Sequence, residues 1–324
     1  MNSKINLILG TMTFGEQLFE NDVVDIMKYY LDAGYQEIDT AYVYNEGKSE
    51  ELIGLCLKQL GSDKVKIATK VNPRITGKLD GAAVHLQFPK SLERMNVDSV
   101  DVLYLHFPDK NTPIESALEV CQEYYEKGLF RELGLSNFPA WLVAYVYHTC
   151  LENGWVRPSV YEGVYNPLSR KAEDELNDTL NAYHMRFNAY NPLAGGMLTN
   201  KYSNFKEDPL TGRFTYRPNY QDRYWKESYF KAINLIKEEC TKASIDIVSA
   251  SYRWLAYHSM LNEDRGDGLI AGFSRLSQLR QNIAALQQGP LPEKILNVFS
   301  DAWEICKNDS PEYYKYYQGR EEMG

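Results

Sequence analysis

Four residues with side chains that commonly move protons lie at or just after the ends of short apolar runs. They are Asp39, Tyr44, Lys70 and His106. In a parallel α/β fold the carboxyl ends of the strands lie at one face, so these four side chains are expected to meet there. Asp39 alone could equally be a helix cap or a surface acid, and Tyr44 is one of 25 tyrosines. These four side chains would form a site only if they lie close together in the fold.

The chemistry of such a group follows from its residue types. A buried ammonium without a partner is costly, so an inward Lys70 requires an acid, and Asp39 can supply it. The lysine cation favours the phenolate of Tyr44 and is expected to lower the pKa of that hydroxyl. Tyr44 then becomes a candidate proton donor to a carbonyl oxygen. His106 could orient the carbonyl or relay the proton, although a lone histidine is more often a packing residue.

The segments that must position these residues alternate between strand and helix patterns along the chain. Strands are predicted over residues 5–9, 37–41, 65–71, 100–106, 132–135, 159–164, 186–190 and 268–271. Helices are predicted over residues 22–33, 49–60, 82–95, 114–127, 140–153, 172–182, 229–242, 247–257 and 276–286. This alternation predicts a parallel sheet, and its length and strand number favour a closed (β/α)8 TIM barrel over an open sheet.

Three further segments complete the predicted architecture. Residues 199–223 are polar and rich in tyrosine without a clear period, residues 292–307 predict an added C-terminal helix, and residues 313–317 form an aromatic tail. The tail could fold over the mouth of the barrel or be a disordered end. No linker composition interrupts the chain, so residues 1–324 are expected to form a single domain.

Composition limits the function classes. The formal net charge is −9, and no run rich in lysine and arginine stands out, which argues against nucleic acid or an acidic membrane surface as a partner. No window has the apolar length of a membrane span, and no secretory signal is evident at the start. The five cysteines are widely spaced without a CxxC motif, so we expect buried thiols rather than disulfides or a metal site. A cytoplasmic protein is the expectation.

The motifs at the predicted strand ends resemble those of the aldo-keto reductase superfamily along nearly the whole chain. The shared motifs are Gly10-Thr11-Met12, Asp39-Thr40-Ala41-x-x-Tyr44, Ala68-Thr69-Lys70, Leu105-His106, Gly134-Leu135-Ser136-Asn137 and Tyr190-Asn191-Pro192-Leu193-Ala194-Gly195-Gly196. Within the superfamily the chain looks most like the branch of aflatoxin-aldehyde and succinic semialdehyde reductases. The resemblance implies that Asp39, Tyr44, Lys70 and His106 are a catalytic tetrad.

The same resemblance implies that NADPH is the cofactor and that it binds extended, without a Rossmann fold. Ser136 and Asn137 would hold the nicotinamide carboxamide, and Tyr190 would stack on the ring. The remaining cofactor residues implied by position are Glu162, Asn191, Leu193, Gly195, Gly196, Gly272, Ser274, Arg275, Gln278, Gln281 and Asn282. The helix that begins near Leu276 would offer its N-terminus to the 2′-phosphate.

Two residues depart from the family pattern. Position 162, usually Gln in the family, is Glu here, and we hypothesise that its added negative charge favours the oxidised cofactor. Arg275 stands where Ser or Asn is frequent, and it could pair with a 2′-phosphate or simply be a solvated charge at a helix start.

The sequence says less about the substrate than about the cofactor. Candidate pocket residues are Met12, Tyr42, Trp141, Arg223 and Trp225. A carboxylate on the substrate could pair with an arginine of the irregular segment or with Lys315 of the tail.

Three functions therefore stay open at this point. The first is an NADPH-dependent reductase of aldehydes or ketones, and the second is a biosynthetic ketoreductase for a sugar or polyketide carbonyl. The third is a redox-sensing binding subunit similar to the β subunits of potassium channels. A homodimer is also open, because members of this branch form dimers.

Overall fold

The computed structural model describes residues 5–61, 65–207, 213–217 and 219–319. Its strands are parallel and close into a barrel in sequence order, with β8 paired to β1. They are β1 (Asn6–Gly10), β2 (Glu37–Asp39), β3 (Lys66–Val71), β4 (Val100–Leu105), β5 (Phe130–Ser136), β6 (Pro158–Val164), β7 (Arg186–Tyr190) and β8 (Gly268–Gly272). The predicted TIM barrel is confirmed.

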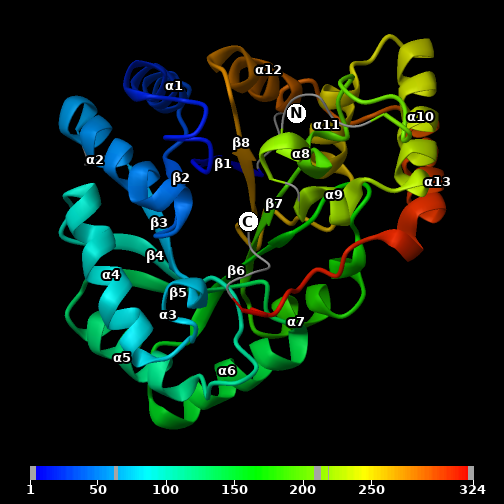
Figure 1. Ribbon diagram of the computed structural model, residues 1–324. Coiled ribbons are helices and arrows are strands. Elements are labelled where there is room, and N and C mark those ends of the chain that lie inside the picture. Colours follow the sequence, from blue (N-terminus) through cyan, green and yellow to red (C-terminus); the bar gives the residue numbers. More distant parts are fainter. Residues whose placement is uncertain (1–4, 62–64, 208–212, 218, 320–324) are drawn as a thin grey trace.

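Helices surround the barrel (Figure 1). They are α1 (Glu20–Asp32), α2 (Lys48–Leu60), α3 (Pro73–Thr76), α4 (Gly81–Met95), α5 (Glu115–Glu126), α6 (Ala140–Asn153), α7 (Leu176–Ala182), α8 (Arg213–Tyr216), α9 (Asn219–Tyr224), α10 (Glu227–Lys242), α11 (Ile247–Tyr257), α12 (Leu276–Leu286) and α13 (Glu293–Cys306). Short 3-10 turns occur at η1 (Tyr44–Gly47), η2 (Lys171–Glu173), η3 (Ala194–Gly196) and η4 (Lys307–Asp309). None of the described helices has the length and apolar character needed to cross a bilayer.

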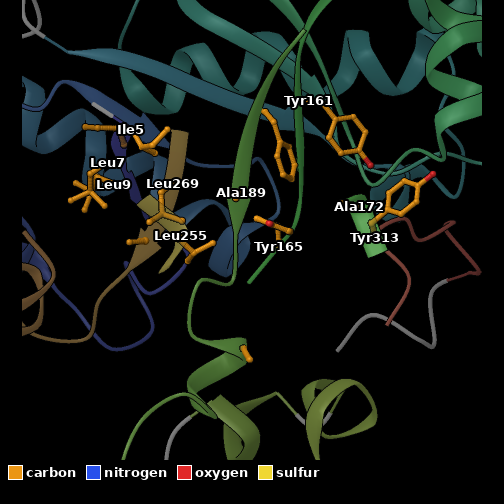
Figure 2. Packing of buried hydrophobic residues seen from close by; sticks show 14 of the residues in the cluster. Ile5, Leu7, Leu9, Tyr161, Tyr165, Ala172, Ala189, Leu255, Leu269 and Tyr313 are labelled. Atoms are coloured by element: carbon orange, nitrogen blue, oxygen red, sulfur yellow. The ribbon is translucent and has the colours of Figure 1, made fainter. Parts of the chain in front are cut away.

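The main core lies between the barrel and the helices. Apolar strand residues such as Leu7 and Leu9 of β1 point outward into it, and Figure 2 shows them close to Leu269 of β8. Each helix contributes the apolar residues that its 3.6-residue period places on one face. In α1 these include Val23, Ile26 and Met27.

The interior of the barrel has a different composition. Alternation along a strand sends Ala68 and Lys70 to the same side of β3, with Val102 and Tyr104 on the neighbouring β4. Gly134 makes room for the Tyr104 ring, because a Cβ at that position would lie 2.3 Å from it. The interior thus has a small apolar layer, and two charged residues are in register with its members, Lys70 with Tyr104 and Asp39 with Ala68.

The structure refines three predicted segments. The predicted strand 132–135 extends over Phe130–Ser136, because Phe130 still pairs with Val100. The predicted helix 172–182 is broken into η2 and α7 at Asp174, where the backbone turns to a ψ of −77°. The irregular segment 199–223 contains the two short helices α8 and α9, which Figure 1 draws in front of the barrel.

The added helix and the aromatic tail also have defined places. The predicted helix 292–307 is α13, which packs against α10. The tail then runs from α13 back toward the barrel (Figure 1). It is tied to the loops after β4 and β5, since the amide of Tyr317 donates to Pro108 and that of Lys315 donates to Asn137. This tail lies beside the mouth of the barrel.

Candidate active site

An ion pair inside the barrel is the centre of the site. The ammonium of Lys70 donates a short hydrogen bond to Asp39 and a bond of 2.8 Å to the carbonyl of Thr40. Lys70 is 0% exposed, so it carries its charge only with these partners. Burial by itself would lower the pKa of Lys70, but the Asp39 carboxylate raises it, and the pKa lies well above its usual range. Lys70 is therefore a fixed cation.

Tyr44 lies next to this cation. The Lys70 nitrogen is 5.4 Å from the centroid of the Tyr44 ring, and the His106 ring is 6.0 Å from it in an edge-on arrangement. The loop that carries Tyr44 is held in an unusual conformation, with positive φ values at Asn45 and Glu46. The Asn45 amide secures this turn by donating to the carbonyls of Met12 and Phe14. The four predicted side chains do meet at one mouth.

The titration of Tyr44 differs from the expectation. Burial is the largest influence and raises the pKa of Tyr44, and the Asp39 carboxylate raises it further. Lys70 lowers that pKa, as predicted, but it does not outweigh burial. The predicted influence of Lys70 is present, but the net pKa of Tyr44 is raised. The hydroxyl is thus protonated at neutral pH, which is the state that a proton donor needs.

His106 is held as a neutral ring. Burial, followed by the charge of Lys70, lowers the pKa of His106 well below its usual range. The amide nitrogen of Asn72 lies 3.0 Å from Nδ1, and the amide oxygen of Asn72 accepts from the backbone of Arg74. Because an amide nitrogen only donates, Nδ1 must accept and the proton must lie on Nε2. His106 can therefore donate a hydrogen bond from Nε2.

The mouth opens into a cavity of about 650 Å³. It extends from Asp39, Tyr44 and His106 to the loop after β8 and the start of α12. Most of the predicted cofactor residues line it. These are Asn137, Glu162, Tyr190, Asn191, Leu193, Gly195, Gly196, Gly272, Ser274, Gln278, Gln281 and Asn282.

Two predicted cofactor residues are not among those that line the cavity. Ser136 is fully buried and accepts a hydrogen bond from Asn137 at 3.0 Å, so it stands behind that residue. Arg275 is exposed at the N-terminal end of α12. Asn137 itself is rigidly placed, because its oxygen accepts from the Tyr190 hydroxyl at 2.7 Å.

Predicted substrate residues divide into two groups. Met12 and Arg223 line the cavity. Trp141 is 63% exposed on α6, Tyr42 stacks under Arg94 at 4.2 Å, and the Trp225 indole donates to the carbonyl of Phe205. These three side chains lie outside the cavity, and substrate contact is not retained for them. Their aromatic character suggested a pocket wall, but packing against other elements decided where they lie.

Comparison with known proteins agrees with this geometry. The model of the aldo/keto reductase family matches residues 6–304. The chain belongs to this family.

Among relatives, the chain is 41% identical over 320 residues to aflatoxin B1 aldehyde reductase member 2 of Rattus norvegicus. The aligned region covers 95% of this chain and 87% of that protein. It is 40% identical over 321 residues to human aldo-keto reductase family 7 member A3, with 95% and 96% covered. An aldo-keto reductase of Pseudocercospora fijiensis is 34% identical over 291 residues, with 87% and 97% covered. The predicted resemblance is confirmed.

Members of the aldo/keto reductase family are oxidoreductases that act on small carbonyl compounds with a nicotinamide dinucleotide, and the cavity fits such a group. Oε2 of Glu162 is buried at the cavity wall and accepts no hydrogen bond from any residue that the structure describes, so a polar ligand could use it. The backbone of the η3 loop takes positive φ at Ala194, Gly195 and Gly196, and both glycines line the cavity. A Cβ at Gly195 would lie 2.9 Å from the Tyr220 ring.

Several residues of this aldo-keto reductase site were not found by sequence reasoning. Asn72 fixes the tautomer of His106, and Gln87 braces Asn72 by exchanging two hydrogen bonds with its backbone. Asn72 follows β3 two residues after Lys70, so the rule about strand ends could have selected it. Arg74 also lines the cavity and comes from α3, the short helix that Asn72 caps. Gln87 lies on α4 and not at a strand end, so that rule could not have selected it.

Proposed function

We propose that this aldo-keto reductase uses NADPH to reduce aldehydes or ketones to alcohols, with Tyr44 as the general acid. The observation that carries the proposal is the meeting of Tyr44, Lys70 and His106 at the mouth of the 650 Å³ cavity. Bound in this cavity, the dinucleotide would supply the hydride for the carbonyl carbon.

Each residue has a separate role in the proposal. Tyr44 gives its phenolic proton to the carbonyl oxygen, and the nearby Lys70 cation stabilises the phenolate that remains. Asp39 holds Lys70 in place through their hydrogen bond. His106, protonated at Nε2, donates a hydrogen bond that aligns the carbonyl.

The preference for NADPH over NADH rests on the start of α12. Ser274 and Gln278 line this end of the cavity, and the positive end of the helix dipole favours an anion there. Arg275, exposed at the same helix end, could reach a 2′-phosphate from solvent.

The substrate class we propose is a small aldehyde that carries a carboxylate. Arg223 and Lys315 both line the cavity, and they come from the α9 segment and the tail. The neighbouring tyrosines, led by Tyr190, raise the pKa of Arg223 above its usual range despite burial, so its charge is permanent. Relatives named as aldehyde reductases support the aldehyde part of this proposal.

The test is NADPH oxidation with 4-nitrobenzaldehyde, succinic semialdehyde, methylglyoxal, a quinone and an aldose. We expect turnover of aldehydes, and we expect Tyr44→Phe to lower kcat by about 10²–10⁴-fold while cofactor affinity stays unchanged. Loss of cofactor binding in Tyr44→Phe would refute the assigned role. Tight NADPH binding without turnover of any compound would favour the binding-subunit function or a narrow ketoreductase.

A further inference from the structure

Glu162 places a second carboxyl group beside the catalytic lysine. Its Oε2 lies 3.3 Å from the Lys70 nitrogen, and both side chains are buried. Two of the three ammonium hydrogens are already used by Asp39 and by the carbonyl of Thr40. One cation therefore faces two carboxyl groups, from β2 and from β6, inside a closed barrel.

This arrangement is short of positive charge. If Asp39 and Glu162 were both ionised, the buried cluster would carry a net charge of −1, which is unfavourable in a medium of low dielectric constant. The other titratable groups that interact with Glu162 are tyrosine hydroxyls, those of Tyr44, Tyr104, Tyr161 and Tyr190. Burial raises the pKa of all four, so none of them changes charge near neutral pH. One of the two carboxyl groups must then hold a proton.

The geometry assigns that proton to Glu162. Asp39 accepts a short charge-assisted hydrogen bond from Lys70, which stabilises its ionised form, whereas Oε2 of Glu162 accepts no hydrogen bond from the part of the chain that the structure describes. Burial and then the Asp39 carboxylate raise the pKa of Glu162 well above its usual range. In the free protein Glu162 is thus a neutral acid at the wall of the cavity.

We propose that Glu162 is a proton site linked to the redox state of the cofactor. It keeps its proton in the free protein and with the uncharged dihydronicotinamide, and it releases this proton to solvent when the positively charged nicotinamide binds. The inference rests on the proposed function, which puts the nicotinamide beside Glu162. Atoms and charge balance in this step, because the Glu162 carboxylic acid becomes a carboxylate and one proton leaves to solvent. No other bond changes.

Binding measurements without turnover test this linkage. The ratio of Kd for NADPH to Kd for NADP⁺ is measured between pH 6 and 9, and protonation of the 2′-phosphate cancels because both forms carry it. In the native protein the ratio should rise by up to about tenfold per pH unit while Glu162 holds its proton. Glu162→Gln should make the ratio independent of pH. Glu37→Gln, which removes a carboxylate at the other end of β2, should keep the native dependence.

Calorimetry in two buffers with different ionisation enthalpies counts the protons directly. The native protein should release close to one proton on binding NADP⁺ and none on binding NADPH, and Glu162→Gln should release none with either. The native measurement decides the question even if the variant does not fold. A pH-independent ratio in the native protein, with both forms bound and no proton released, would overturn the inference. Failure of both dinucleotides to bind would instead overturn the proposed function.

Discussion

The side-chain amide of Asn72 donates to Nδ1 of His106 across 3.0 Å, and this contact decides which nitrogen of the imidazole faces the cavity with a proton. Asn72 follows β3, whereas His106 follows β4, so two neighbouring strand ends supply the donor and its support.

Replacing Asn72 by Ala should therefore damage catalysis by releasing the tautomer of His106. We expect kcat/KM for an aldehyde to fall by about 10–100-fold, the range typical when a supporting partner of a functional histidine is lost. Nitrogen NMR of the His106 ring should show a mixture of tautomers in the variant and one tautomer in the native protein. Asn153→Ala, which removes an amide that donates to Thr149 within the same helix, is the matched control. A single unchanged tautomer in Asn72→Ala would contradict the assignment.

Lys70 should be needed for stability as well as for catalysis. Lys70→Met leaves Asp39 and Glu162 buried without their cation, and we expect the free energy of unfolding to fall by about 3–5 kcal/mol. Adding Asp39→Asn to this variant removes one stranded carboxyl group and should restore part of the loss. Denaturation by urea, followed by circular dichroism, measures both. If the losses in the two single variants simply add in the double variant, the carboxyl group of Asp39 is not destabilising once Lys70 is absent.

The stability of the protein should depend on pH through Glu162. Burial raises the pKa of Glu162, so the folded protein holds a proton that the unfolded chain releases above a pH of about 4.3. The folded state binds more protons in this window, so the free energy of unfolding falls as pH rises toward the folded pKa. The slope should reach at most about 1.4 kcal/mol per pH unit. Glu162→Gln should lack this contribution, which urea titrations of both proteins at several pH values can measure. Parallel pH profiles would contradict it.

Arg223 should select substrates that carry a negative charge. Removing its guanidinium by Arg223→Leu should raise KM for succinic semialdehyde by about 10–100-fold. This factor corresponds to the loss of a hydrogen bond to a charged group, which contributes about 1.5–3 kcal/mol. The value for 4-nitrobenzaldehyde should change little, because that substrate has no carboxylate. Arg131→Leu, at an arginine whose side chain is largely exposed at the opposite end of the barrel, is the control. Equal losses for both aldehydes would point to a structural role for Arg223.

The pattern of residues along the chain was sufficient to predict the architecture and the meeting place of the four candidate catalytic residues. Alternating periods of two and 3.6 residues, repeated along the chain, specify parallel strands and covering helices because each pattern buries its apolar face in only one kind of element. Residues at the ends of the strands then had to meet at one face, and Asp39, Tyr44, Lys70 and His106 do so. Local order in the chain was sufficient for this step.

The electrostatics of the site and the residues of the pocket wall depend on tertiary packing. The pKa of Tyr44 depends on how far burial outweighs the charge of Lys70, and that balance depends on packing from several strands. Trp141 and Trp225 are both large aromatic residues, but one is exposed and the other packs outside the cavity. The meeting of Glu162 with Lys70 joins residues far apart in sequence. Burial and distance between such residues are properties of the closed barrel, and no short stretch of sequence contains them.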